Sequence, residues 1–378
     1  MQYIIMLHKT NYSNIPKFIE DKISRKLHLQ KNHPIEIIKN HIYSYFNGLC
    51  DYKFITFDNL DPIVSIENNF DRLLIPKNHV TRTKSDSYYV NENQILRTHT
   101  SAHQNELLSL GYKSFLVTGD VFRKDEIDSS HYPIFHQMEM FTLIDNKCAD
   151  DELKKILSGL IEYLFPNCNY RFNDDYFPFT NPSYEIEVEY RGKWMEILGC
   201  GIVEQQILLS NNITNTQAIA SGFGLDRLAM IFCDIPDIRF LWSTHDRFLN
   251  QFSDGKLNKF HQYSEVPSQS KDISFYIPKN KLMLKSYNEL SDDKKHISWL
   301  DENDFYELIR NNIEDIIEVK LIDSFYNKKL DKYSRTYKLI YSPSDAEIKD
   351  PSEFTKCVNI SQDNLRDIIK NNLALELR

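Results

Sequence analysis

Three side chains in one extended segment have the types that a polar ligand site requires. The segment IFHQMEMFTLI (134–144) alternates as a β-strand does, and residues two apart in a strand face the same side. Phe135, Gln137 and Glu139 therefore share one face, and His136 faces the other. The oxygens of Gln and Glu together can accept the hydrogen bonds of an ammonium group. A sheet face open to water would carry the same row, so both interpretations stay open.

Two arginines stand where they could bind anions. Arg123 ends the preceding extended segment, SFLVTGDVFR (114–123), across a hairpin from the polar row. Its planar guanidinium group matches a carboxylate or a phosphate, and an ion pair with Asp125 or Asp128 is the alternative. Arg227 follows the glycines of GFGLDR, in the opening turn of an expected helix, where a phosphate could bind. That segment fits neither the dinucleotide nor the P-loop pattern, and no strand obviously leads into it.

Paired phenylalanines and histidines are two further candidate features. Phe177 and Phe179 flank Pro178, whose fixed backbone angle predicts that both rings project to the same side. Such a pair could hold an aromatic ligand edge-to-face, or could belong to an ordinary core. Histidines could bind a metal ion, although no Glu-containing metal motif supports them: His99 with His103, and His131 with His136. Metal-dependent hydrolysis is therefore the less favoured chemistry.

The elements that must position these residues indicate an α+β fold. Between about residues 88 and 210, short extended segments predict an antiparallel sheet, with a hairpin turn at 191–193. A helical stripe starts after His33, with Pro34 in its first turn. The last third has the ferredoxin-like order β-α-β-β-α-β, with Ser361 as the expected N-cap of its second helix. Its expected elements are strands at 272–277, 315–326, 332–342 and 373–377 and helices at 302–312 and 361–372.

Composition and charge exclude several classes of protein. The chain has 378 residues, 41% of them hydrophobic, which is enough for more than one domain. No apolar run approaches the ~18 residues of a membrane-spanning helix. The six cysteines include no CxxC pair, so zinc fingers and thioredoxin-like chemistry are unsupported. The net charge of −9 excludes a global basic footprint, so any nucleic acid must bind a local patch.

The strongest candidate for such a patch lies on the expected hairpin of the last third. Basic side chains there are interleaved with tyrosines that could stack on unpaired bases: Lys328, Lys329, Lys332, Arg335 and Lys338 with Tyr326, Tyr333 and Tyr337. A charged, solvated hairpin is the alternative.

Long motifs in a fixed order resemble those of the class II aminoacyl-tRNA synthetases, in the phenylalanine-specific, single-chain organellar branch. The resemblance covers the chain from His33 to the C-terminus and rests on these segments: RTHTSAHQ (97–104), GDVFRKDEIDSSHYPIFHQMEMF (119–141), FPFTNPS (177–183), WMEILGCG (194–201), GFGLDRLAMIFCDIPDIRFLW (222–242) and SKDISFYIP (270–278). It implies a class II antiparallel sheet flanked by helices, plus a C-terminal ferredoxin-like domain. The implied parts are an N-terminal extension (1–32), a catalytic domain (33–246), a linker (247–262) and an anticodon-binding domain (263–378).

The resemblance also assigns roles residue by residue. Arg123 matches the arginine that bridges the amino-acid carboxylate and the α-phosphate of ATP, and Arg227 matches the one on the γ-phosphate. The other matches are, for ATP, His131, Phe135 and Glu196, the last also for Mg²⁺; around the substrate ammonium, His99, Ser101, Gln137 and Glu139; and around the phenylalanine ring, Phe177, Phe179 and Ala220. The basic hairpin with Lys328, Lys329, Lys332 and Arg335 is the expected tRNA contact.

The implied activity is ATP- and Mg²⁺-dependent ligation of phenylalanine to tRNA(Phe), by a monomer with no membrane partner. The implied compartment is the mitochondrial matrix, with another organelle as the alternative, and no targeting segment is identifiable. The chain has no room for an editing domain between its motifs, so no hydrolysis of tyrosyl-tRNA is expected. Two alternative functions are a paralogue that binds tRNA without catalysis and a class II synthetase for another amino acid such as phosphoserine. The intact arginines argue against the first, and the Phe177/Phe179 pair argues against the second.

Overall fold

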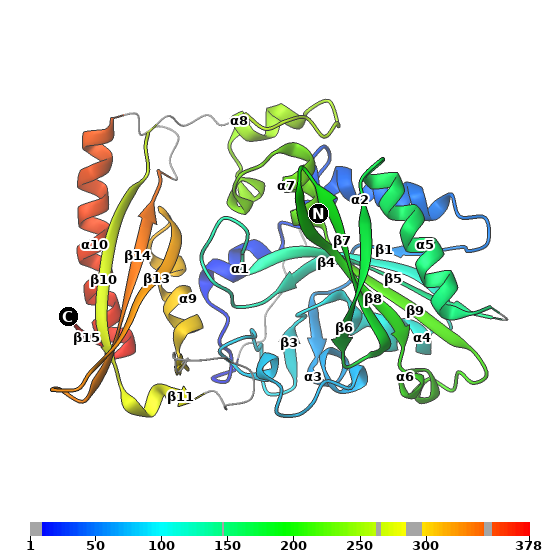
Figure 1. The fold of residues 1–378 in the computed structure, drawn as a ribbon, viewed down its shortest axis with the longest axis horizontal. Helices are drawn as coiled ribbons and strands as arrows, with labels where there is room; N and C mark the ends of the chain where they lie inside the picture. Colours follow the sequence, from blue (N-terminus) through cyan, green and yellow to red (C-terminus); the bar gives the residue numbers. More distant parts are fainter. Residues whose placement is uncertain (1–9, 146, 262–265, 285–296, 344–349) are drawn as a thin grey trace. The chain divides into compact units, whose positions relative to one another are not determined.

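The structure is a computed structural model and describes residues 10–145, 147–261, 266–284, 297–343 and 350–378. The chain divides into two compact units, each formed by two stretches of sequence (Figure 1). Unit 1 comprises Met1–Arg123 and Pro133–Phe260, and unit 2 comprises Lys124–Tyr132 and His261–Arg378. Unit 2 thus includes a short segment that interrupts the sequence of unit 1.

Unit 1 is built on a seven-stranded sheet with the strand order β1-β4-β5-β9-β8-β7-β6 (Figure 1). Neighbouring strands are antiparallel except β1 and β4, which are parallel. The strands are β1 (Ile55–Phe57), β4 (Ser114–Phe122), β5 (Ile134–Ile144), β6 (Tyr170–Phe177), β7 (Thr180–Tyr190), β8 (Lys193–Val203) and β9 (Gln217–Gly224). This sheet and its helices confirm the predicted α+β fold class.

Alternation along β5 separates two faces of the sheet, as the sequence predicts. His136 and Met138 are fully buried, whereas Phe135 and Gln137 on the other face are partly exposed. Three helices pack together on the face of His136 and Met138, and Phe46 of one of them contacts Phe223 of β9. These helices are α2 (Pro34–Asn47), α5 (Ala149–Leu164) and α7 (Leu225–Cys233). The opposite face carries the polar row of Phe135, Gln137 and Glu139.

Two connections in this sheet follow from local backbone requirements. The turn between β7 and β8 holds Arg191 and Gly192 at φ values of 53° and 77°, the left-handed conformation of a two-residue hairpin turn. The connection from β9 to α7 is direct, because Gly224 ends the strand and Leu225 begins the helix. The prediction that no strand leads into the GFGLDR segment is therefore wrong. Its glycines, which are rare in strands, hide the strand pattern.

Short elements complete unit 1. Near the N-terminus, Ile19, Ile23 and Leu27 are buried. Near its other end, Phe248 and Phe252 are fully buried and in ring contact with each other. The elements are α1 (Lys17–Ile23), η1 (Leu27–Leu29), β2 (Ile63–Ser65), α3 (Ile66–Asn69), η2 (Asp71–Leu73), η3 (Val80–Arg82), β3 (Gln94–Leu96), η4 (Thr100–His103), α4 (Gln104–Ser109), α6 (Gln205–Ser210), η5 (Ile238–Trp242), α8 (Asp246–Leu249) and η6 (Asn250–Phe252).

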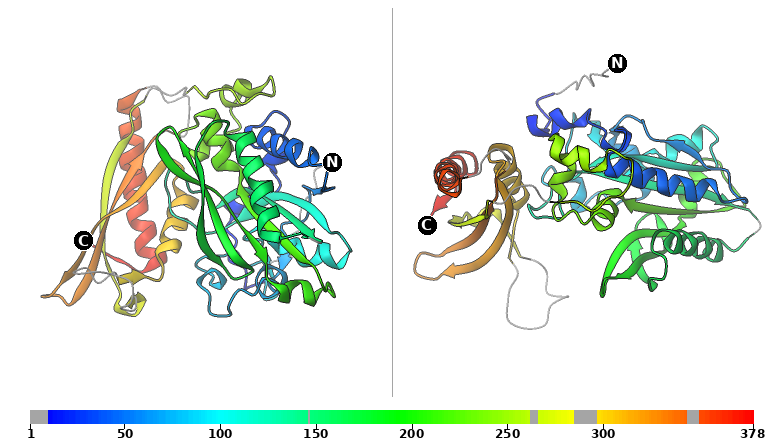
Figure 2. Two further views of the ribbon diagram at one scale, coloured as in Figure 1. Left: turned by 45° about the vertical axis from the view of Figure 1, so that its right-hand side comes forward. Right: turned by 90° about the horizontal axis from the view of Figure 1, so that it is seen from above.

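Unit 2 has a four-stranded antiparallel sheet with the order β13-β14-β10-β15. This order, with helices α9 and α10 adjacent on the sheet (Figure 2), is the ferredoxin-like arrangement that the sequence predicts. The elements are β10 (Gln269–Ile277), η7 (Lys279–Lys281), β11 (Leu282–Leu284), β12 (Ile297–Trp299), α9 (Glu302–Asn312), β13 (Ile316–Asn327), β14 (Lys332–Tyr341), α10 (Pro351–Leu373) and β15 (Glu376–Leu377).

The second helix of unit 2 begins ten residues earlier than the sequence predicts. α10 starts at Pro351, and the Asp350 side chain accepts a hydrogen bond from the backbone N–H of Ser352 at 2.9 Å. Ser361 therefore lies inside the helix, and its assignment as the N-cap is wrong. The Asp-Pro pair is a helix start in its own right, because Asp caps and Pro suits the first turn.

The segment Lys124–Tyr132 is held in unit 2 by its core and by charges. Ile127 belongs to the buried core of that unit, and its carbonyl accepts a hydrogen bond from Val319 N–H at 2.9 Å. Lys124 is buried and forms ion pairs with Asp304 and Glu307, at 2.9 and 2.6 Å. Burial lowers the pKa of Lys124, but the two carboxylates more than offset this and raise it above its ordinary value.

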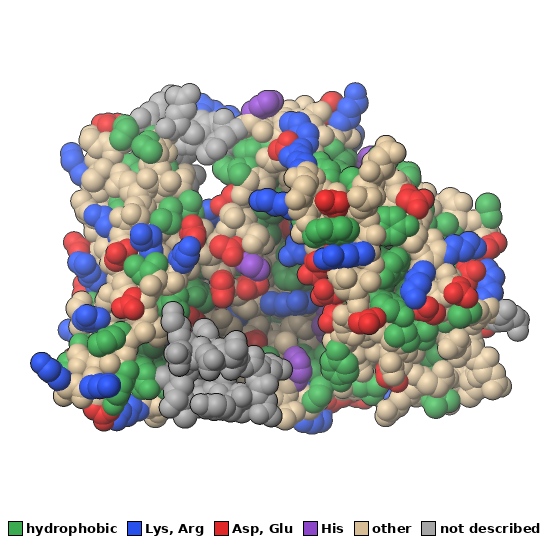
Figure 3. All heavy atoms as spheres, viewed as in Figure 1, with side chains coloured by type: hydrophobic (Ala, Val, Ile, Leu, Met, Phe, Trp, Pro, Cys, Tyr) green, Lys and Arg blue, Asp and Glu red, His purple; other side chains and the backbone are tan. Residues whose placement is uncertain are grey.

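Surface charge agrees with the mixed composition. On the face shown in Figure 3, basic and acidic side chains are interspersed among hydrophobic ones. Among the helices that the structure describes, none has the length and apolar character needed to cross a membrane.

Candidate active site

On the central strands of unit 1, glycines lie beside the polar residues of β5. Gln137 on β5 lies opposite Gly119 on β4 and Gly224 on β9, and Glu139 lies opposite Gly222. A Cβ added at Gly222 or Gly224 would meet no atom within 4 Å, so the floor beside the polar row is open. At Gly119 the space is taken by Arg97, whose Nη2 would lie 1.9 Å from an added Cβ. The glycine at position 119 therefore leaves room for the guanidinium group of Arg97.

Glu139 is the buried carboxylate of this site. Ser101 Oγ donates to one of its oxygens, and Gln104 Nε2 donates to the other at 2.7 Å. Burial raises the pKa of Glu139 to about 7, although both hydrogen bonds lower it. A carboxylate poised in this way gains stability from a cation placed beside it. Gln104 was missed by the sequence analysis, although its place three residues after Ser101 in a helical turn was the available signal.

The paired phenylalanines do lie together, as their spacing predicts. The rings of Phe177 and Phe179 are stacked, with centroids 5.9 Å apart and planes 13° apart. Phe177 covers Gly199 so closely that an added Cβ would come within 2.8 Å of its ring. Phe179 packs against a buried cluster that contains Ala220, which is 5% exposed. The two rings, at the end of β6 and in the turn before β7, thus form an aromatic surface beside Gly199 of β8 and Ala220 of β9.

His99 links this aromatic surface to the carboxylate. Its ring lies 6.4 Å from that of Phe179, and it directly precedes the η4 turn that carries Ser101. Burial, together with the positive charge of Arg123, lowers the pKa of His99 to about 3. The imidazole is therefore neutral at physiological pH. The four predicted residues around the ammonium, His99, Ser101, Gln137 and Glu139, come from η4, its N-cap and β5.

Arg123 lies beside Phe135 at the end of the sheet. Its Nε donates to the Thr98 carbonyl at 2.7 Å, which fixes the guanidinium group. The guanidinium carbon is 5.2 Å from the centroid of the Phe135 ring, within the range of a cation–π contact. The guanidinium group of Arg123 can bind an anion, and the adjacent ring of Phe135 can stack on an aromatic base.

Arg227 and Glu196 of unit 1 lie next to each other and carry opposite charges. Arg227 lies in the first turn of α7, and its Nη1 donates to the Glu196 carbonyl at 3.1 Å. The same nitrogen is 3.7 Å from the Glu196 carboxylate, and both side chains are about half exposed. The preceding residue, Asp226, is buried and points to the other face of the sheet, where it contacts His136. The side chains of Asp226 and Arg227, neighbours at the start of α7, therefore point in different directions.

The remaining predicted site residues lie in unit 2. His131 contacts Asp128 at 2.7 Å; burial lowers its pKa, but this carboxylate raises it above the ordinary value. Lys328, Lys329 and Lys332 are exposed or partly exposed at the hairpin end. Near them the rings of Tyr326 and Tyr333 lie 4.7 Å apart.

The prediction that Arg335 belongs to an exposed basic patch is wrong. It is 6% exposed and forms an ion pair with Glu302 at 2.6 Å, inside unit 2. Tyr337, which the sequence analysis also placed on the surface, is fully buried and accepts a hydrogen bond from Arg335. Alternation along β14 directs both side chains inward, against the helices. They belong to the core and not to a tRNA surface.

Comparison with known proteins decides the family. The family model "tRNA synthetases class II core domain (F)" matches residues 19–252. A curated relative from Arabidopsis thaliana, "Phenylalanine--tRNA ligase, chloroplastic/mitochondrial", is 44% identical over 379 residues, which cover 97% of this chain and 83% of the relative. The chain belongs to the class II phenylalanine–tRNA ligases. The resemblance found in the sequence is thereby confirmed.

Other members of this ligase family show which type the chain represents. A mitochondrial phenylalanine–tRNA ligase of Dictyostelium discoideum is 38% identical and aligns with 97% of this chain and 89% of the relative. The mitochondrial ligase of Saccharomyces cerevisiae is 33% identical and aligns with 97% of this chain and 92% of the relative. By contrast, a phenylalanine–tRNA ligase alpha subunit of Prochlorococcus marinus aligns with only 58% of this chain. The chain is of the single-chain organellar type.

Proposed function

We propose that unit 1 activates L-phenylalanine with ATP and transfers it to tRNA(Phe), the reaction of the phenylalanine–tRNA ligases, in the mitochondrion. One observation carries the assignment of substrate. The turn that begins at His99 connects the stacked Phe177/Phe179 pair to Glu139, so an aromatic side chain and an ammonium group can bind together. That combination fits the two ends of phenylalanine.

The ammonium end binds at the polar row. Glu139 supplies the negative charge and Gln137 an amide oxygen, while Ser101 and Gln104 hold the carboxylate in place. The neutral imidazole of His99 adds no positive charge that would repel the ammonium group. The substrate ring then lies against Phe177 and Phe179, with Ala220 at the bottom of the pocket.

Arg123 and Arg227 bind the negative groups. Arg123 bridges the carboxylate of phenylalanine and the α-phosphate of ATP, Phe135 stacks on adenine, and Arg227 binds the γ-phosphate. A carboxylate oxygen attacks the α-phosphorus and the bond to pyrophosphate breaks, so the protein needs only to align the reactants and neutralise charge. His131 is a further candidate nucleotide contact, by the resemblance of its motif to that of the family.

Mg²⁺ fits the donor set on this side of the site. Magnesium binds proteins through one or two carboxylates together with substrate phosphates, and Glu196 offers a half-exposed carboxylate next to Arg227. Glu196 would hold the ion, which supplies charge neutralisation on the phosphates of ATP.

Unit 2 binds tRNA through the end of its β13–β14 hairpin. The contact comprises Lys328, Lys329 and Lys332 with the Tyr326/Tyr333 ring pair, and it excludes Arg335. The hydroxyl of the terminal tRNA ribose then attacks the carbonyl of the adenylate, and AMP leaves. The chain acts as a monomer and lacks tyrosine editing; rapid hydrolysis of tyrosyl-tRNA(Phe) by the pure protein would refute the second of these statements.

Aminoacylation of tRNA(Phe) with radiolabelled phenylalanine tests the assignment. The full chain should form phenylalanyl-tRNA, and Arg123→Gln should lower the rate by roughly 10²-fold or more, because a fixed positive charge at the transition state is lost. The matched control is Arg171→Gln, which removes an exposed arginine of β6 that pairs with Glu187. No charging by the full chain would refute the function. Equal rates for Arg123→Gln and the control would refute the role of Arg123.

A further inference from the structure

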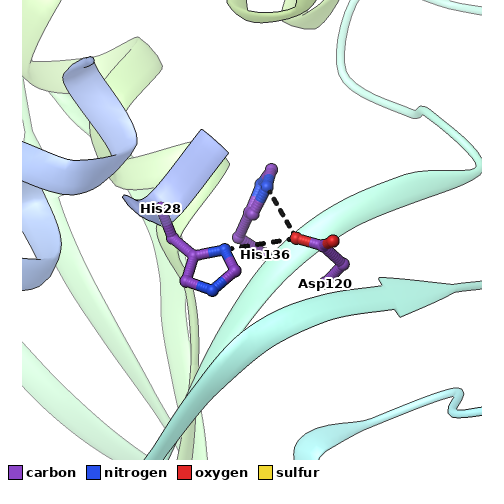
Figure 4. A group of neighbouring side chains, drawn as sticks. All are labelled: His28, Asp120 and His136. Atoms are coloured by element: carbon purple, nitrogen blue, oxygen red, sulfur yellow. Dashed lines mark ion pairs between the residues drawn. The ribbon is translucent and has the colours of Figure 1, made fainter. Parts of the chain in front are cut away.

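A second cluster of chemically active side chains lies on the helix-covered face of the sheet, away from the active site. His28 of η1, Asp120 of β4 and His136 of β5 converge there, as Figure 4 shows. His28 Nδ1 is 3.2 Å and His136 Nε2 is 3.1 Å from the same oxygen, Asp120 Oδ1. All three residues are at most 2% exposed. The three atoms lie within 4.8 Å of one another.

The outer partners of both histidines fix which ring nitrogen carries the proton. His28 Nε2 lies 2.8 Å from the Asp58 carbonyl, and His136 Nδ1 lies 3.1 Å from the Asp226 carboxylate. Both partners are acceptors, so both of these nitrogens must donate. In a neutral imidazole the other nitrogen then holds a lone pair. These lone pairs, on His28 Nδ1 and His136 Nε2, are the atoms directed at Asp120.

Three electron-rich atoms therefore meet at one buried point. Both nitrogens lie within ion-pair distance of Asp120 Oδ1, at 3.2 and 3.1 Å, but among the described residues neither contact has the geometry of a hydrogen bond. Such an arrangement requires positive charge at its centre. Ligand atoms separated by these distances can both bind one zinc ion at about 2.0–2.1 Å. A histidine that binds a metal commonly donates its other N–H to a carboxylate or a carbonyl, as both histidines do here.

We propose that His28, Asp120 and His136 form a structural site for one divalent zinc-type ion, with Asp226 and the Asp58 carbonyl as its outer shell. Two imidazoles and one carboxylate suit zinc and neighbouring transition metals better than magnesium or calcium. The ion is distinct from the Mg²⁺ that accompanies ATP, because the cluster lies on the opposite face from Gln137.

The site would brace the strands that carry the active-site residues. Asp120 is three residues from Arg123, and His136 lies between Phe135 and Gln137. His28 comes from the N-terminal part of the chain, and the His136 ring also stacks on Trp242 with centroids 5.6 Å apart. An ion here ties η1 to β4 and β5, at the back of the catalytic floor. The competing occupant is a pair of protons, which would make both histidines imidazolium ions.

Metal analysis of the full chain separates the two occupants. The protein is purified without a polyhistidine tag, its divalent metals are measured by mass spectrometry, and stripped protein is titrated with Co²⁺ and with Zn²⁺. The proposal predicts about one equivalent of zinc-type metal per chain, visible d–d absorption bands with Co²⁺, and a higher melting temperature on adding Zn²⁺. Less than about 0.1 equivalent, no Co²⁺ bands and no thermal shift would show that protons occupy the cluster.

Two variants test whether the metal binds at this cluster. His28→Gln keeps an N–H donor near the Asp58 carbonyl but removes the Nδ1 ligand, so metal content and Co²⁺ bands should be lost. The control is His33→Gln, because His33 is also buried but its ring nitrogens contact the Leu241 carbonyl and the Ile35 N–H. It should retain the metal. Full metal content in His28→Gln would overturn the assignment. If a variant fails to fold, the Co²⁺ spectrum of the unaltered chain still decides whether a His-containing site exists.

Discussion

At the scale of single residues, the site depends on one carboxyl group whose proton is poised for release. Glu139 is buried, and its pKa is raised to about 7 from the ordinary value of 4.5. In the proposed complex the substrate ammonium group supplies the positive charge that stabilises the buried carboxylate, so binding and ionisation should support each other. The same group should therefore govern both substrate affinity and the pH dependence of stability.

Glu139→Gln should raise KM for phenylalanine by about 10- to 100-fold, because a buried charged hydrogen bond is lost. With the unaltered chain, KM should fall as pH rises from 6 to 8, since the carboxylate forms across that range. Pyrophosphate exchange at several pH values measures both effects. A KM that stays constant with pH would contradict the role of Glu139.

Glu139→Gln should also stabilise the fold at high pH. The folded state binds this proton more tightly than the unfolded chain, so the carboxyl costs nothing below pH 4.5 and on the order of 3 kcal/mol above pH 7. Urea unfolding should show a gain of up to that size at pH 8 and little change at pH 4.5. An equal effect at both values would mean that ionisation is not the cause.

The proposed place of Ala220 at the bottom of the phenylalanine pocket gives a prediction about substrate selectivity. Ala220 is 5% exposed in the cluster that packs against Phe179, so Ala220→Gly should make room at the far end of the substrate ring. Activation of para-chlorophenylalanine relative to phenylalanine should increase roughly tenfold or more, as one methyl group is worth about 1–3 kcal/mol in such pockets. Unchanged selectivity would place the pocket elsewhere.

At the scale of elements, the alternation of β5 was predictable because a strand repeats every two residues. The sequence thereby placed His136 away from Gln137, and the Phe-Pro-Phe spacing brought the two rings together. The predictions that were wrong concern residues whose partners lie far away in the sequence, or a strand whose residues do not show the usual strand pattern. Arg335 looks like a surface charge until Glu302 of α9 is placed beside it, and the glycines of β9 conceal its strand. His28 and Asp120 are separated by 92 positions of sequence, so no local pattern connects them.

The start of α10 gives a test at this scale. Asp350→Ala removes the observed N-cap and should lower the free energy of unfolding by about 0.5–2 kcal/mol. Ser361→Ala, within the same helix, should change it by less than about 0.5 kcal/mol. Urea unfolding of the two variants measures this difference. A larger loss for Ser361→Ala would restore the start predicted from sequence.

At the scale of the whole molecule, one acidic chain has to perform two tasks with local charge. Unit 1 concentrates positive charge at Arg123 and Arg227, and unit 2 presents lysines at the end of a hairpin. Local stripes can bind RNA although the net charge is −9, because electrostatic attraction is screened beyond about 10 Å. The two tasks should therefore be separable by mutation.

Charge reversal on the hairpin tests that separation. Lys329→Glu combined with Lys332→Glu should weaken tRNA binding and reduce its salt dependence, because phosphate contacts are lost. Pyrophosphate exchange, which requires no tRNA, should keep its rate. Filter binding at several salt concentrations measures the first effect. Loss of both activities would indicate misfolding, and unchanged tRNA binding would remove the hairpin from the interface.

The central claim is that unit 1 joins phenylalanine to AMP, and amino-acid-dependent ATP–pyrophosphate exchange tests it most directly. The pure chain is assayed with phenylalanine, tyrosine and phosphoserine in parallel. We expect exchange with phenylalanine, roughly 10²-fold weaker exchange with tyrosine, and none with phosphoserine. Absence of exchange with phenylalanine, or faster exchange with either of the other two, would contradict the account.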